Sequence, residues 1–142
     1  MQLAPLLNGI SDLLQTALAS PVSLGPPAAG ASGVFVWPWR LAVNPQSRKI
    51  PPNVVTSRPT GPALDVHFIV LVTPSFTPEG LSRLEQAHQA LFDRPVLRVG
   101  EASSEIAWEE LDNETLSRLL MSASLPTIIV LSYVARAVSS SS

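Results

Sequence analysis

The hydrophobic and polar positions of this chain follow two periods, one typical of helices and one typical of strands. Over residues 3–18 the apolar side chains recur every three or four positions, which predicts an amphipathic helix that ends before Pro21. Over residues 64–73 they recur at every second position on one face, which predicts a strand. The other face of this strand begins with Asp65 and His67 and then becomes apolar. We therefore expect the strand to enter from solvent and to end buried on both sides.

Two further helices are predicted from their start signals. Thr77 is a suitable N-cap and Pro78 a suitable first helical residue, and Asp112 is a suitable N-cap for a later helix. The buried stripes expected for these two helices are Leu81, Leu84, His88 and Leu91, and Leu116, Leu119, Leu120 and Ala123.

Shorter apolar runs at residues 34–37, 96–99, 106–108 and 127–138 predict the remaining strands. Pro38 cannot donate a hydrogen bond to a neighbouring strand, so its strand should lie at a sheet edge or carry a bulge. The Pro38-bearing strand and the C-terminal strand are the edges we expect. Together the elements predict an α/β fold of the α+β type, with three helices packed on a largely antiparallel sheet of four to five strands.

Three segments have no helical or strand period. Residues 20–33 are rich in Pro, Ala and Gly and predict a flexible linker or loop, and residues 44–62 predict a long Pro-rich loop. Residues 139–142 predict a disordered Ser tail. We expect one domain over residues 1–138, which includes the first two of these segments and has a size that suits a single hydrophobic core.

Composition excludes several classes of protein. The net charge of −2 gives no basic footprint for nucleic acid, and the absence of Cys excludes disulfide frameworks and thiolate metal sites. No charged residue lies between Asp12 and Arg40, but prolines and glycines interrupt this run, so we expect no membrane span. Only 14% of the residues are charged, against about 25% in a typical soluble domain.

The residues offer little catalytic chemistry. Asp65 and His67 lie two positions apart on one strand and therefore share a face, where they could form an acid–base pair of a small hydrolase or ligand-binding domain. No nucleophile motif or phosphate-binding loop accompanies them, so no catalytic, cofactor or metal site is expected. Each histidine is more typical of a half-buried side chain with a local hydrogen bond. Glu109 and Glu110 are expected to be solvated.

Aromatic and basic residues are the better candidates for function. Trp37 and Trp39 lie on a strand that is already apolar. Either the rest of this chain covers their side chains on both faces of the sheet, or part of this apolar surface contacts another chain. The basic residues Arg48, Lys49 and Arg58 in the long loop could contact an anionic partner or could simply be solvated. The interface candidates are Trp37, Trp39, Arg40, Arg48, Lys49, Arg58, Tyr133 and Arg136.

Several segments resemble one known family when they are taken in order. Residues 62–70, PALDVHFIV, look like the signature strand of the tail-terminator (cap) proteins of contractile injection systems, which are phage-tail-like particles. Residues 44–48 are similar to the family's loop that enters this strand, and residues 88–97 to its central helix and following strand. Residues 116–120 and 133–138 resemble its last helix and strand. The resemblance covers nearly the whole chain.

The resemblance implies a non-enzymatic structural cap without cofactors. Such a protein would form a homo-hexameric ring at the baseplate-distal end of the particle, where it would terminate the inner tube and anchor the last sheath ring. Its partners would be its own copies, the sheath protein, and the inner tube or a tube-terminator protein. Assembly would be cytoplasmic, in a particle that is either released or membrane-docked. The alternatives are another structural adaptor of the same machine, in the baseplate or linked to the tube, and the small hydrolase or ligand-binding domain.

Overall fold

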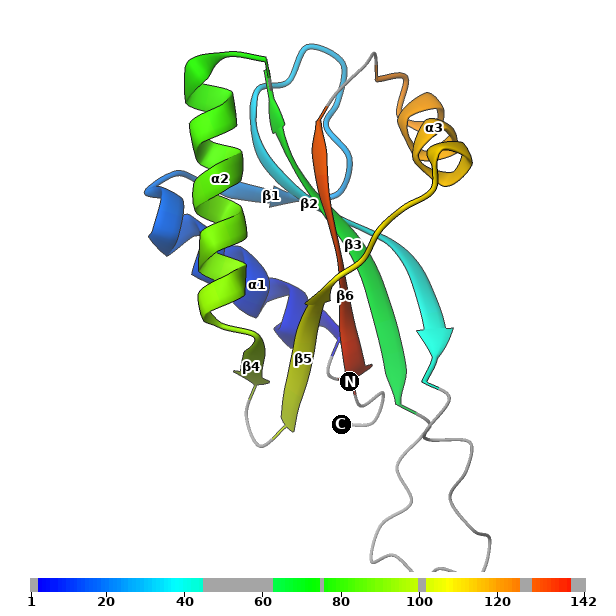
Figure 1. Cartoon of the computed structure of the whole chain (residues 1–142). Coiled ribbons are helices and arrows are strands. Elements are labelled where there is room, and N and C mark those ends of the chain that lie inside the picture. The colour runs from blue at the N-terminus through cyan, green and yellow to red at the C-terminus, as the bar shows by residue number, and fades with distance from the viewer. Residues whose placement is uncertain (1–2, 45–62, 75, 100–101, 126–128, 139–142) are drawn as a thin grey trace, which may run out of the picture.

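The structure is a computed structural model that describes residues 3–44, 63–74, 76–99, 102–125 and 129–138 (Figure 1). The predicted long loop beyond Asn44 and the predicted Ser tail lie outside these ranges. In chain order the elements are α1 Leu3–Leu18, β1 Val22–Leu24, β2 Gly33–Val43, β3 Leu64–Thr73, α2 Pro78–Asp93, β4 Val96–Val99, β5 Ala102–Trp108, α3 Asn113–Ser122 and β6 Val130–Val138. The chain is therefore a mixed α+β protein, as the sequence pattern predicts.

The strands form one sheet in the order β1-β2-β3-β6-β5-β4. The β1–β2 pair is parallel and the other four pairs are antiparallel. The prediction of four to five strands is low because it misses β1, whose residues 22–24 lie within the predicted linker. Three residues are too few to show a period. A backbone hydrogen bond of 2.8 Å from Gly25 N–H to the Val36 carbonyl continues this pairing.

The expected sheet edges are wrong for the C-terminal strand β6 and only partly right for β2, which pairs with β1 over residues 34–36 alone. β6 lies between β3 and β5, and β2 lies between β1 and β3, so β1 and β4 are the edge strands. Strand order depends on pairing between distant segments, which local sequence does not encode. The prediction for Pro38 is nevertheless confirmed, because the β2–β3 register shifts between Pro38 and Arg40. Trp39 is the extra residue at this bulge.

Both helix starts follow their predicted caps. The Thr77 hydroxyl accepts a hydrogen bond of 2.9 Å from Gly80 N–H, and the Asp112 carboxylate accepts one of 2.6 Å from Thr115 N–H. These bonds satisfy backbone donors that have no partner in the first turn of a helix. The N-terminal helix predicted over residues 3–18 is also confirmed as α1.

One face of the sheet packs against α1 and α2 and forms the main core (Figure 1). β3 supplies its centre and is buried on both faces over residues 68–71, as the change from polar to apolar positions predicts. In α2, Leu84 and Leu91 are buried as expected, but Leu81 and His88 are exposed and Ala87 takes the place between them. The side chains that meet in this core include Leu6, Ile10, Leu14, Leu84, Ala87, Leu91, Val66, Phe68, Val70 and Val72.

The opposite face carries a smaller cluster of Phe35, Ile69 and Leu71, against which the tryptophans of β2 and Leu111 pack. The expectation that all three helices bury a stripe on the sheet is wrong for α3, which has no buried residue. Leu116, Leu119 and Leu120 of this helix are only partly covered, and Met121 is exposed. Figure 1 shows α3 standing to one side of the sheet, away from α1 and α2. None of the described helices combines the length and the apolar character needed to cross a bilayer.

Candidate interaction surfaces

The face of the sheet opposite α1 and α2 carries a histidine–carboxylate pair. His67 Nδ1 lies 2.7 Å from Oε2 of Glu109, and the two side chains are 13% and 24% exposed. The sequence pattern places Glu109 in solvent, and this expectation was wrong. The partner of Glu109 is 42 residues away in the chain, a separation at which local pattern gives no signal. The expectation that His67 is partly buried with a hydrogen bond is confirmed.

Trp39 closes one side of this pair. Its ring lies 5.7 Å from the His67 ring, and its indole Nε1 is buried without a hydrogen-bond partner among the described residues. The bulge in β2 explains the placement, because an extra residue redirects the side chains of a strand. An aromatic ring beside the imidazole limits access of water to the contact between His67 and Glu109. This contact therefore holds Glu109 against the sheet.

The backbone of Glu109 is also fixed to the sheet. Its N–H donates to the Ser132 carbonyl at 3.0 Å, and the Ser132 hydroxyl donates to the carbonyl of Glu109. These bonds and the contact with His67 hold the segment that connects β5 to α3. The connection is therefore anchored, although α3 itself buries nothing.

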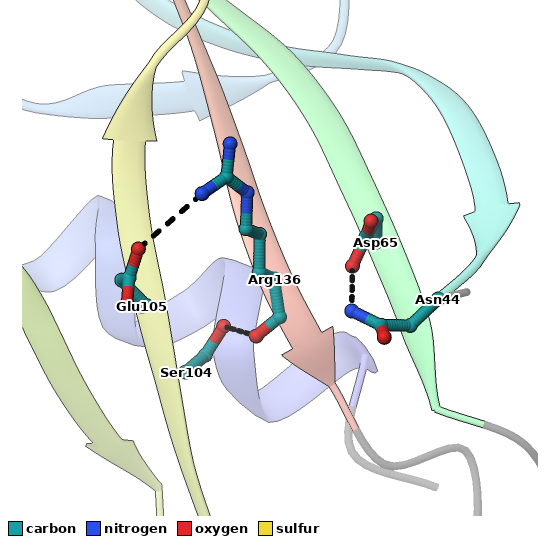
Figure 2. Close-up of polar contacts among 5 residues, drawn as sticks. All are labelled: Asn44, Asp65, Ser104, Glu105 and Arg136. Atoms are coloured by element: carbon teal, nitrogen blue, oxygen red, sulfur yellow. Dashed lines mark hydrogen bonds and ion pairs between the residues drawn. The ribbon is translucent and has the colours of Figure 1, made fainter. Parts of the chain in front are cut away.

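Asp65 and His67, which could form an acid–base pair on their strand, make two separate contacts. Oδ1 of Asp65 accepts a hydrogen bond of 2.8 Å from Nδ2 of Asn44, at the end of the sheet where β2 and β3 separate (Figure 2). His67 instead contacts Glu109. The described residues contain no group of three side chains suited to holding a metal ion.

A second site lies on the helix-covered face, between α2 and β5. His88 Nδ1 lies 2.7 Å from the Tyr133 hydroxyl, so this histidine is hydrogen-bonded as expected, although it is exposed and its partner lies 45 residues away in the chain. The Tyr133 ring stacks on Phe68 with centroids 5.6 Å apart, and Trp108 meets Tyr133 edge-on at 5.5 Å. Burial raises the pKa of the Tyr133 hydroxyl above its ordinary value. The hydroxyl is therefore neutral at ordinary pH and able to bond to His88.

His88, Trp108 and Tyr133 line an open pocket of about 280 Å³. Its lining is completed by Leu91, Phe92, Pro95 and Ile106, so the pocket is mainly apolar. Its rim is exposed: Phe92 is 71% exposed, Val96 next to Pro95 is 53% exposed, and Trp108 is 48% exposed. The rim is a concentration of large apolar side chains of the kind that marks contact surfaces. The residues of the pocket come from α2, Pro95, β5 and β6, so local sequence pattern gives no signal for it.

A polar row crosses the other face. Arg136 Nη1 lies 3.4 Å from Oε1 of Glu105 on the neighbouring strand, and the Arg136 carbonyl accepts a hydrogen bond of 2.9 Å from the Ser104 hydroxyl (Figure 2). Arg136 and Glu105 are exposed, and so is Arg40, which pairs in register with His67. This part of the face therefore presents charged side chains to solvent.

The structure divides the predicted interface candidates into three groups. Tyr133 is 3% exposed, and Trp37 and Trp39 are partly buried against the smaller cluster, so these side chains stabilise the fold. Arg40 and Arg136 are exposed. Arg48, Lys49 and Arg58 lie outside the described residues. An interface role for these residues remains a prediction.

Comparison with known proteins gives matches at the level of structure. A scan against protein-family models and a search of the curated proteins found no match. Among solved structures, the chain is similar to the sheath/tube terminator of PVC, an extracellular contractile injection system, in its extended state. That similarity has a TM-score of 0.72 at 13% sequence identity and covers 100% of this chain and 58% of the other.

The chain is also similar to the tube-terminating cap of the anti-feeding prophage, AFP. Here the TM-score is 0.67 at 14% identity, over 96% of this chain and 55% of that chain. The chain thus spans little more than half the length of each of these proteins. Its described fold is that of the corresponding part of two terminator proteins.

Proposed function

We propose that this chain is a structural terminator of a contractile injection system, placed at the end of the particle far from the baseplate. One observation carries the proposal: the fold is shared over 96–100% of the chain with two proteins that terminate the tube of such systems. The order of sequence segments that resembles the tail-terminator family supports it independently.

The partners we propose are other copies of this chain in a homo-hexameric ring, the last ring of sheath subunits, and the end of the inner tube. A ring suits the role, because a helical polymer ends in open head-to-tail interfaces, and a cap must cover them without exposing an identical new one. The exposed rim of Phe92, Val96 and Trp108 supplies apolar surface for contacts of this kind.

The geometry of the sheet suggests how a sheath subunit attaches. β1 pairs with β2 only over residues 34–36, so the outer edge of β2 beyond Val36 has no neighbouring strand among the described residues. An added strand could bond there to free backbone groups. Pro38 removes one donor from this edge, and Arg40 adds charge. Both features restrict nonspecific pairing and favour a partner matched to the bulge.

The proposed role is non-enzymatic. The carboxylate–imidazole contact fastens a connecting segment to the sheet and is shielded by Trp39, and Asp65 bonds elsewhere. We propose that the chain is assembled into the particle in the cytoplasm and then remains part of it, whether the particle is released or docked at a membrane.

Position on the particle tests this proposal. A small epitope tag should be added to the chain and located by gold labelling of intact particles. The proposal predicts one labelled end, opposite the baseplate. Label at the baseplate would instead indicate an adaptor, and label along the sheath would exclude a terminator.

A further inference from the structure

The pocket between α2 and β5 has the size of a side-chain receptor. Its volume of about 280 Å³ is below the roughly 300–1,000 Å³ typical of small-molecule sites. A cavity on the order of 150 Å³ accommodates a group of the size of benzene. The pocket would therefore hold about two large apolar side chains, and its exposed rim would be covered by the element that carries them.

The chain itself presents an element of this kind. α3 has no buried residue, its Leu119 and Leu120 are only partly covered, and Met121 is 77% exposed. These three residues lie in the C-terminal part of the helix. An amphipathic helix normally buries its apolar side chains against another element. In α3, no residue is fully buried within the described part of the chain, so its apolar side is only partly covered.

The helix and the pocket cannot meet within one molecule. The pocket lies on the face covered by α1 and α2, whereas Leu111, just before α3, packs on the opposite face and the neighbouring Glu109 is fastened there by His67. Figure 1 shows α2 and α3 on opposite sides of the sheet. Contact between them therefore requires two copies in a head-to-tail arrangement, which is the type of interface that closes rings.

We propose that α3 of one copy docks on the α2–β4–β5 pocket of a second copy, with Leu120 and Met121 entering the pocket. α3 is about 15 Å long at 1.5 Å per residue, and β4 is about 13 Å long at 3.3 Å per residue. A helix lying along the edge strand β4 would therefore place its C-terminal turn at the pocket and its first turn near Arg98.

Charge complementarity supports this placement. The start of α3 carries Asp112 and Glu114, of which Glu114 pairs with Arg118 of the same helix, and no basic residue lies in its last turn. Arg94 adjoins the pocket, Arg98 is exposed on β4, and neither takes part in the ion pairs among the described residues. Asp112 at the start of α3 would thus face Arg98, which has no ion-pair partner among the described residues. The inference deepens the proposed function and rests on it only for closure of the contact into a ring.

Thiol cross-linking of the purified full chain tests the contact, because the protein has no Cys. Met121→Cys and Phe92→Cys should be combined and treated with a short bismaleimide. Head-to-tail contact predicts a ladder that extends beyond dimers for the double variant, and nothing larger than dimers for either single variant. Met121→Cys with Leu24→Cys is the matched control, since Leu24 is 48% exposed on the other edge strand.

A ladder no stronger than that of the control pair, or an internal cross-link within monomers, would overturn the inference, provided that circular dichroism shows a folded chain. Failure of the proposed function is recognised separately. A terminal gold label on particles without a cross-link ladder would leave the cap role intact and reject this interface. A cross-link ladder together with a gold label at the baseplate would support this interface and reject the cap role.

Discussion

Replacing Glu109 by Ala tests whether the contact with His67 holds the β5–α3 connection to the sheet. The substitution removes a hydrogen bond to a charged group and leaves the largely buried imidazole without its partner. Bonds of this kind contribute about 1.5–3 kcal/mol, and an unsatisfied buried polar group costs a similar amount. We therefore expect a loss of about 2 kcal/mol in the free energy of unfolding. Glu109→Gln should lose less, because the amide can still bond to the ring.

Glu110→Ala is the matched control, since this neighbouring side chain is exposed and its bond to the Trp108 indole is at the surface. Such a surface change should stay within about 0.5 kcal/mol. In urea, an m-value of about 2 kcal/mol/M converts the expected loss for Glu109→Ala into a midpoint shift of about 1 M. Tryptophan fluorescence reports the transition, because Trp39 lies against His67. Equal midpoints for the Glu109 and Glu110 variants would refute the fastening role.

Three further predictions concern the core, the buried hydroxyl and the cap of α3. Phe68→Ala should lower the free energy of unfolding by about 3–5 kcal/mol, because this side chain is fully buried, whereas Phe92→Ala should change it by less than about 0.5 kcal/mol in the same urea experiment. The raised pKa of Tyr133 favours its neutral form in the folded chain, so its contribution to stability is complete below the unfolded pKa of about 10 and is lost as pH rises through the higher folded value. Tyr133→Phe should remove this alkaline loss of stability in thermal melts. An unchanged dependence of the melting temperature on alkaline pH would contradict the assignment. The pKa of Asp112 is lowered mainly by its hydrogen bonds with Thr115, so capping is present above the ordinary carboxyl pKa of 3.8 and is lost as pH falls through the lower folded value. The protection factor of the Thr115 amide, which compares its exchange with that of a free amide at the same pH, should therefore fall in this range, and Asp112→Ala should remove the protection above it.

Local sequence signals account for the elements that were predicted well. The caps at Thr77 and Asp112 act within three residues, and the alternation in β3 reports burial on each face directly. Pro38 was read correctly for a similar reason, because a missing donor constrains the strand that contains it. These features depend on near neighbours and therefore appear in the pattern itself.

Features that depend on distant pairing were missed. β1 is defined by its partner in β2 and has no period of its own. His67 finds Glu109 at a separation of 42 residues, and His88 finds Tyr133 at 45. The apolar stripe of α3 predicted a buried helix, but periodicity shows only that a helix has an apolar side and does not identify what covers it. The same incompletely covered stripe is the basis for the proposed contact between copies.

The length of particles made without this chain tests the terminator role most directly. Strains with and without its coding sequence should be compared by negative-stain electron microscopy, with sheathed tube lengths measured over many particles. The terminator role predicts tubes of irregular length or partly lost sheath in the deletion strain, restored by supplying the chain in trans. Uniform, fully sheathed particles of normal length in its absence would contradict the account.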